Sequence, residues 1–220
     1  MKETLRSLTA PEVLERIKRF NGRYVKDWNC WLHVSRDCDF RVASISIPVA
    51  KEFKRIMGKW QACRKRGGLC CPIELQSTLN AAAEPLKSVG SFDLRSFQAP
   101  SEVLTNAIYN LWRIFEEGLC LKRMASEVGV SKAILLVTKG RIGPAIDSNV
   151  QSHLDTCVIG CTTYIKALGE IASELANFEA REGTTLEVLA EQARRPADVG
   201  RVVDMVLGPR GCEQREISTR

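Results

Sequence analysis

The sequence Ser131–Leu154 is SKAILLVTKGRIGPAIDSNVQSHL. It begins with an apolar run, continues through a basic turn that contains glycines, and then has an aspartate followed by a second short segment. The apolar residues after Ser131 have the length of a short helix, which the glycines and Pro144 end. Asp147 follows at a position that is typical of a helix N-cap. The stretch therefore predicts two short helices joined by a turn, with a carboxylate at the start of the second helix.

Around this stretch, apolar residues recur at helical spacing over most of the chain. Residues 24–47 are less regular and predict a loop, in which the alternating run 40–47 is compatible with a short strand. The chain has no alternation of strands with helices, so it predicts a mainly α fold. The predicted helices span about 9–20, 48–66, 72–89, 101–118, 119–128, 148–180 and 184–207, the last kinked or divided at Pro196.

The composition indicates a folded chain, since 45% of its 220 residues are hydrophobic and 26% are charged. We expect one globular helical domain over residues 1–207, with room for lobes at 1–100 and 101–207, and a flexible tail over 208–220. The charged start MKETLRSLTA lacks the apolar centre of a signal peptide, and no run reaches about 18 apolar residues. These features predict a cytoplasmic protein without a membrane span.

Nine cysteines without a secretory signal predict reduced thiols rather than a disulfide framework. Cys30, His33 and Cys38 are close enough in sequence to be considered as zinc ligands. Their spacing is unusual for zinc, and the neighbouring Trp28 and Trp31 are typical of a core, so buried free thiols are the competing interpretation. No phosphate-binding or dinucleotide-binding glycine motif occurs. The sequence therefore predicts no cofactor and no metal.

The formal net charge of +6 is accompanied by clusters of basic residues, which are compatible with a polyanionic partner if they converge in space. A solvated surface is the alternative. The clusters are Lys54-Arg55, Lys59, Arg64-Lys65-Arg66, Lys122-Arg123, and Lys139 with Arg141.

The basic turn is a candidate phosphate site, because glycines let backbone N–H groups approach an anion closely. Its candidate residues are Lys139, Gly140, Arg141 and Gly143, and an ordinary turn is the alternative. Asp147 is a catalytic candidate, since a carboxylate stabilises an oxocarbenium-like transition state. The competing interpretation is a simple helix cap, and the two roles are compatible.

The step Ile146-Asp147-Ser148-Asn149-Val150 resembles the end of the catalytic motif of the helix-hairpin-helix DNA glycosylases. The resemblance covers about thirty residues and implies a helical scaffold whose hairpin loop holds a DNA phosphate through backbone N–H groups. It also implies that Asp147 supports a positively charged sugar and activates water or a nucleophilic lysine. Lys132 stands at the position of that lysine.

Two alignments of the hairpin loop remain open. In the first, Gly129 lies in the loop and Glu127–Ser131 lacks the proline and the second glycine of the family, with about one helical turn fewer before Asp147. In the second, the loop is Gly140–Gly143 and almost no helix precedes the aspartate. The cysteine spacing of the iron–sulfur members is absent. The stretch also resembles uncharacterised proteins of the same scaffold.

Two functions follow as hypotheses. The first is a nucleic-acid-associated protein with DNA as its partner, which excises a base by hydrolysis of the N-glycosidic bond at Asp147. The second is a non-enzymatic helical module that binds a protein partner or a second copy of itself. In the second hypothesis Asp147 is only a cap and Lys132 is a solvated helical lysine or pairs with Glu127. The apolar face considered for a partner contains Leu111, Trp112 and Phe115.

Overall fold

The computed structural model describes residues 4–23, 25–64 and 67–208. The described chain is mainly helical, as predicted, and its one β-type pairing is an isolated bridge between Leu69 and Cys120. The helices are η1 (Leu5–Ser7), α1 (Ala10–Arg23), α2 (Val25–Asp37), α3 (Ile47–Lys59), α4 (Pro72–Val89), η3 (Leu94–Gln98), α5 (Glu102–Gly118), α6 (Glu127–Val137), α7 (Ser148–Gln151), α8 (Cys161–Glu182), α9 (Leu186–Gln192) and α10 (Val199–Leu207).

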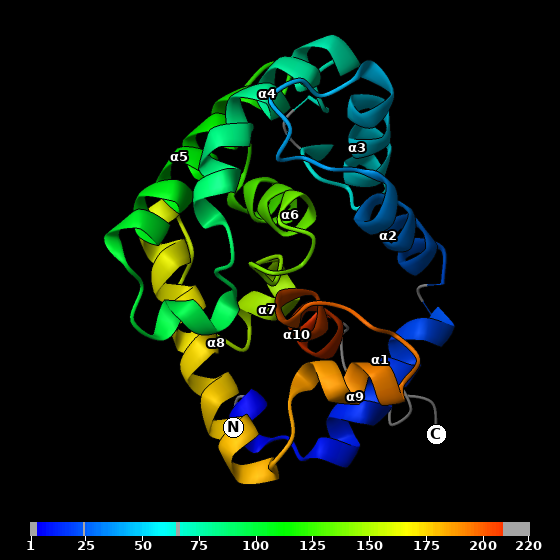
Figure 1. Cartoon of the computed structure of the whole chain (residues 1–220), viewed down its shortest axis with the longest axis vertical. Helices are drawn as coiled ribbons and strands as arrows, with labels where there is room; N and C mark the ends of the chain where they lie inside the picture. Colours follow the sequence, from blue (N-terminus) through cyan, green and yellow to red (C-terminus); the bar gives the residue numbers. More distant parts are fainter. Residues whose placement is uncertain (1–3, 24, 65–66, 209–220) are drawn as a thin grey trace, which may run out of the picture.

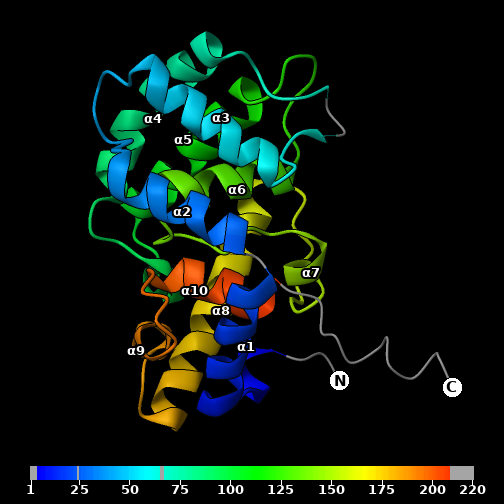
Figure 2. The same cartoon turned by 90° about the vertical axis from the view of Figure 1, so that its right-hand side faces the viewer.

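The helices form one globular domain around a continuous core. Helices α2 to α6 occupy the upper half of Figure 1, α1, α9 and α10 occupy the lower half, α7 lies between them, and α8 runs from beside α5 to the bottom of the molecule. Figure 2 shows the same division from the side. Helix α1 packs against α9 and α10, and α4 packs against α5, so contacts cross the predicted division at residue 100. Segments from both ends of the sequence therefore build the lower half.

Helices α4 and α5 begin where the sequence predicts. Pro72 stands in the first turn of α4, and the Ser101 side chain accepts a hydrogen bond from the N–H of Leu104 at the start of α5. The face of α5 considered for a partner is not exposed: Leu111, Trp112 and Phe115 are buried. The Trp112 ring lies 5.1 Å from that of Tyr164 in α8, because α5 is covered on this side by α8. This face belongs to the core, and the prediction that it binds a partner is wrong.

Helix α2 replaces the loop predicted after residue 24. Trp28, Trp31 and Val34 recur at every third residue and all three are buried, so they form one apolar stripe of a helix. Polar residues and cysteines surround these three side chains in the sequence, so the helical periodicity of this interval is weak.

The short strand considered for residues 40–47 is also absent. The N–H of Ile45 donates to Asn80 Oδ1 at 2.7 Å, and its carbonyl oxygen accepts from Gln76 Nε2 at 2.6 Å. Two side chains of α4 thus satisfy the backbone groups that a neighbouring strand would otherwise pair. The alternating pattern therefore occurs here in an irregular segment with bends at residues 40–44, which leads into α3.

The long helix predicted over 148–180 is divided into α7 and α8. The Gln151 side chain donates to the carbonyl oxygen of Thr156 at 2.7 Å and accepts from the N–H of Val158 at 3.0 Å. Thr156 in turn bonds to Glu170 of α8 through its hydroxyl and its N–H. These side-chain bonds stabilise a non-helical connection that the apolar periodicity alone does not indicate.

The predicted last helix is likewise divided, into α9 and α10, on either side of Pro196. Its cap is Thr185, whose Oγ1 accepts from the N–H of Val188. The predicted flexible tail 208–220 lies outside the described residues except for Gly208, whose carbonyl oxygen accepts from Asn149 Nδ2 at 2.6 Å. Within the described ranges, no helix combines the length and the apolar character that crossing a bilayer requires.

Candidate functional site

The two candidate catalytic residues, Lys132 and Asp147, line one cavity of about 640 Å³. It lies among α6, α7, α10 and the C-terminal ends of α1 and α3, and we call it the Lys132–Asp147 cavity. Its volume falls in the range of roughly 300–1,000 Å³ that is typical of small-molecule sites. Residues far apart in sequence meet here, including Phe20, Lys59, Trp60, Gln61, Val128, Leu135, Asn149, Arg201 and Asp204.

Asp147 is the N-cap of α7. Its Oδ1 accepts from the backbone N–H groups of Asn149 at 2.9 Å and Val150 at 3.2 Å, while Oδ2 accepts no hydrogen bond from a described residue. The preceding segment is fixed, since the N–H of Ile146 donates to the buried Ser131 Oγ at 2.9 Å. The capping role is confirmed, and it leaves one oxygen of an oriented, half-buried carboxylate at the cavity.

Lys132 is half-buried on α6 and donates from Nζ to the carbonyl oxygen of Trp60 at 2.6 Å. It is not a simple solvated lysine, and no ion pair joins it to Glu127 among the described residues. An ammonium group has three donors, so two remain for a ligand after this bond. The carbonyl of Trp60 thus fixes a cation in the wall that also contains Asp147.

Arg201 is the residue of this cavity that the sequence analysis missed. It is only 2% exposed, and its guanidinium carbon lies 5.2 Å from the ring centre of Phe20, 5.0 Å from that of Trp31 and 5.4 Å from that of Trp60. Its Nη1 lies 2.5 Å from Asp204 Oδ2. Buried arginines are typically paired in this way and stack on aromatic faces. The available signal was the Arg-x-x-Asp spacing inside the apolar run of α10, which places both groups on one helix face.

The predicted phosphate-binding turn lies elsewhere and its amides are engaged. The N–H groups of Lys139, Gly140, Arg141 and Ile142 all donate within the turn or to the end of α6. Gly140, with φ +81°, packs against Arg201 and Trp31, so the turn is a tight connection onto α10. These four amides are therefore not available to a phosphate. Gly143 is buried, and a Cβ there would lie 2.5 Å from Leu135.

Arg141 is committed to the backbone of the η3 connection. Its Nη1 donates to the carbonyl oxygen of Gly90, and its Nη2 to that of Phe92 at 2.6 Å. Lys139 and Arg141 line a separate recess of about 110 Å³, together with Asp198. Burial raises the pKa of Asp198, while the nearby Arg141 opposes that shift. The recess is distinct from the Lys132–Asp147 cavity.

Arg141→Ala is expected to lower the free energy of unfolding by about 1.5–3 kcal/mol, because two carbonyl groups lose a charged donor. Chemical denaturation measures this change. Lys139→Ala is the matched control, since it removes the same charge from the same turn and is expected to cost less than about 0.5 kcal/mol. Equal losses in the two variants would contradict a structural role for Arg141.

Gly129, the loop glycine of the first hairpin alignment, lies inside α6. The Ser126 side chain caps this helix by accepting from the N–H of Gly129 at 3.3 Å, so residues 127–131 form helical turns rather than a loop. A Cβ at Gly129 would lie 3.3 Å from Cys63 Sγ. The lack of a side chain at Gly129 therefore allows Cys63 to approach closely, and Gly129 does not line the cavity.

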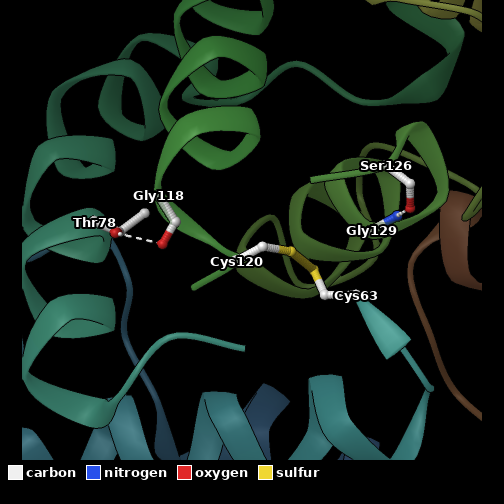
Figure 3. The surroundings of a disulfide bond; sticks show 6 residues. All are labelled: Cys63, Thr78, Gly118, Cys120, Ser126 and Gly129. Atoms are coloured by element: carbon white, nitrogen blue, oxygen red, sulfur yellow. Dashed lines mark hydrogen bonds between the residues drawn. A yellow bond between two sulfur atoms is a disulfide. The ribbon is translucent and has the colours of Figure 1, made fainter. Parts of the chain in front are cut away.

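Cys63 and Cys120 form a disulfide beside this contact, as Figure 3 shows. The prediction that the thiols are reduced is therefore wrong for this pair. The bridge between Leu69 and Cys120 brings the two connections together, and the Cα atoms of the cysteines lie 6.2 Å apart, within the usual range. The same pairing keeps residues 119–126 out of the predicted helix. The other described cysteines are free: Cys30, Cys38, Cys70, Cys71, Cys157 and Cys161.

Two of the three residues considered as zinc ligands have other partners, and the third is buried. Cys30 Sγ accepts from Lys59 Nζ at 3.0 Å, and His33 Nδ1 lies 2.6 Å from an Asp37 oxygen. Cys38 is buried, and this burial raises the pKa of its thiol. In the part of the chain that the structure describes, no group of three or more His, Cys, Asp or Glu residues is arranged for a metal ion.

The lining of the Lys132–Asp147 cavity combines aromatic rings with three cations (Lys59, Lys132 and Arg201) and two carboxylates (Asp147 and Asp204). Its formal charge is +3 − 2 = +1, which suits an anionic ligand that also has an aromatic ring. Comparison of the chain with protein-family models, with curated proteins and with solved structures finds no match.

Proposed function

We propose that this chain is a nucleic-acid-associated protein whose Lys132–Asp147 cavity takes a single DNA nucleotide, and that its reaction is hydrolysis of the N-glycosidic bond. The observation that supports this proposal is the meeting of Lys132 and Asp147 in one cavity with Trp60 and Arg201. The lysine and the aspartate carry the resemblance to the DNA glycosylases. An extruded nucleotide offers a π-face for an aromatic wall and a phosphate for cations.

Asp147 is assigned the electrostatic role. When the glycosidic bond breaks, its electron pair leaves with the base and the sugar C1′ becomes positively charged. A carboxylate fixed by two backbone N–H groups stabilises that charge without having to reorganise. Water then adds to C1′, and its proton passes to Oδ2 of Asp147 and on to the departing base. The cap geometry and the catalytic role therefore use different oxygens of the same group.

Lys132 is assigned a binding role beside Asp147. Its bond to the Trp60 carbonyl holds the ammonium at the wall, and its two remaining donors suit a phosphate oxygen of the strand. Phosphate recognition is assigned to the cavity cations rather than to the turn after α6, whose four amides are engaged. Affinity for DNA is then expected to fall steeply as salt rises.

The proposal is tested first by fluorescence anisotropy with labelled duplex and single-stranded DNA over a salt series. Binding that weakens linearly on a log–log salt plot is expected. Absence of binding at low salt would remove the proposed function.

Asp147→Asn is the second test, applied to a panel of duplexes that each contain one damaged base. Asparagine is as good a cap as aspartate, so the fold is retained, while base release is expected to fall by at least about 100-fold. Asp93→Asn is the matched control, because Asp93 also caps a helix and does not line the cavity. Base release that survives in Asp147→Asn, measured by product chromatography, would contradict the catalytic assignment.

A further inference from the structure

The disulfide lies directly behind one wall of the cavity. Cys63 follows Trp60 and Gln61, which line the Lys132–Asp147 cavity. Cys63 also contacts the Gly129 turn of α6, the helix that contains Lys132. The bond thus joins the end of α3, through Cys120, to the segment that leads into α6 (Figure 3). The restraints on Cys63 therefore also restrain Trp60 and Gln61 in this wall of the cavity.

The backbone of that wall is not in a relaxed conformation. Gln61 has φ +55° and Cys63 has φ +61°, and left-handed conformations are disfavoured for residues that carry a Cβ. Such residues persist where the surroundings hold them. The N–H groups of Gln61 and Ala62 donate to the end of α3, and Gln61 accepts from the neighbouring Arg64, so these bonds are all local. The long-range restraints on this wall include the disulfide, the Lys132 bond to the Trp60 carbonyl, and the contacts of the Trp60 ring with Trp31 and Arg201.

Exposed cations stand close to both cysteines in the sequence. The cysteine side chains themselves are only 3% and 6% exposed, so an attacking thiol reaches the bond when the connections around it open. Arg64 next to Cys63 and Lys122 close to Cys120 are exposed. Arg123 adds a third exposed cation at the same connection. Nearby cations lower the pKa of a cysteine thiol and favour it as the leaving thiolate. They also raise the local concentration of an anionic thiol. Glutathione, which is a tripeptide thiol with a net negative charge, fits this description.

We propose that Cys63–Cys120 is a glutathione-exchangeable bond that controls the Trp60–Cys63 wall of the cavity. The thiolate of one glutathione attacks a sulfur of the bond, forms a mixed disulfide and releases the other cysteine as a thiolate, which takes up a proton. A second glutathione resolves the mixed disulfide. The protein gains two electrons and two protons as two thiols, and two glutathiones leave as one oxidised dimer. The freed wall relaxes at Gln61 and Cys63, and the bond that positions Lys132 is weakened. This inference does not depend on the ligand of the cavity.

The first test is hydrogen exchange of the full chain, followed by mass spectrometry, in oxidised and in reduced glutathione. Alkylation under denaturing conditions is expected to add two more labels to the reduced sample. Exchange in peptides covering Trp60–Arg64 and Glu127–Lys132 is expected to rise by about tenfold or more on reduction, with α8 unchanged. A bond that survives excess glutathione, an unchanged wall, or a rise that extends to α8 each overturns the proposal. Cys157→Ser, which removes an exposed free thiol, is expected to respond as the wild type does.

The second test separates the role of the cations from simple accessibility. Lys122→Gln combined with Arg123→Gln is expected to slow reduction by glutathione by roughly tenfold and to leave reduction by the neutral 2-mercaptoethanol unchanged. Equal effects on both thiols would overturn the assignment of glutathione. Neither test uses nucleic acid, so their failure and the failure of the proposed function are distinguishable.

Discussion

Gly140→Ala is expected to lower the free energy of unfolding by about 3 kcal/mol or more. The added Cβ makes the left-handed backbone unfavourable, and it also overpacks a close contact. Gly140 has φ +81°, and a Cβ there would lie 2.7 Å from Arg201 Cβ and 3.0 Å from the Trp31 ring. Neither neighbour is a flexible chain end, since one is the Cβ next to the backbone of α10 and the other is the ring of the buried Trp31. Chemical denaturation followed by tryptophan fluorescence measures the loss.

Gly183→Ala is the control for this variant. Gly183 ends α8 with φ +64°, and nothing lies within 4 Å of an added Cβ. Its expected cost is only the backbone preference, about 1 kcal/mol. Similar losses of stability in the two variants would contradict the close packing of Gly140 against Arg201 and Trp31.

Arg201→Ala is expected to cost about 3–5 kcal/mol, because it removes one partner of a buried ion pair and leaves Asp204 without its guanidinium. The loss also opens a space among Phe20, Trp31 and Trp60, which surround the guanidinium. The midpoint of urea unfolding gives the size of the effect, and the slope tests whether the native state stays compact.

The double variant Arg201→Met with Asp204→Asn distinguishes charge from packing. Methionine refills the aromatic space, and asparagine keeps an acceptor for the N–H of Ala145, which Asp204 Oδ1 accepts at 3.3 Å. More than half of the lost stability is expected to return, since buried pairs are often replaceable by apolar groups. A double variant as unstable as Arg201→Ala would mean that the charges themselves are needed.

The sequence predicted the helices whose signals are local. Pro72 and Ser101 mark the starts of α4 and α5 because their effects act within one helical turn. The irregular segment at Ile45 depends on Asn80, and the break after Gln151 depends on Thr156 with Glu170. Asn80 and Glu170 lie on other helices, and the Gln151–Thr156 bond joins side chain to backbone, so apolar periodicity does not indicate either contact. Tertiary contacts therefore decided these two segments.

The candidate site was predictable in part for the same reason. Asp147 has a local signature as a cap, and Lys132 was named through the resemblance, but nothing in the sequence places the Trp60 carbonyl beside Lys132. Arg201 could have been noticed as a charge in an apolar run, yet its aromatic neighbours come from three other segments. The glycines of the turn after α6 predict a phosphate site, but in the structure they allow close packing onto α10.

The packing of α1 against α9 and α10 has a consequence for how the protein forms in time. Phe20 and Arg201 line the same cavity from positions separated by most of the chain. During synthesis, α1 emerges from the ribosome long before the helices that cover it, so its apolar face stays uncovered until they have been made. The cavity is thus completed only when α10 has been synthesised. A chain interrupted before α10 lacks Arg201 and Asp204 of the cavity lining and leaves the side of α1 that α10 covers without its partner.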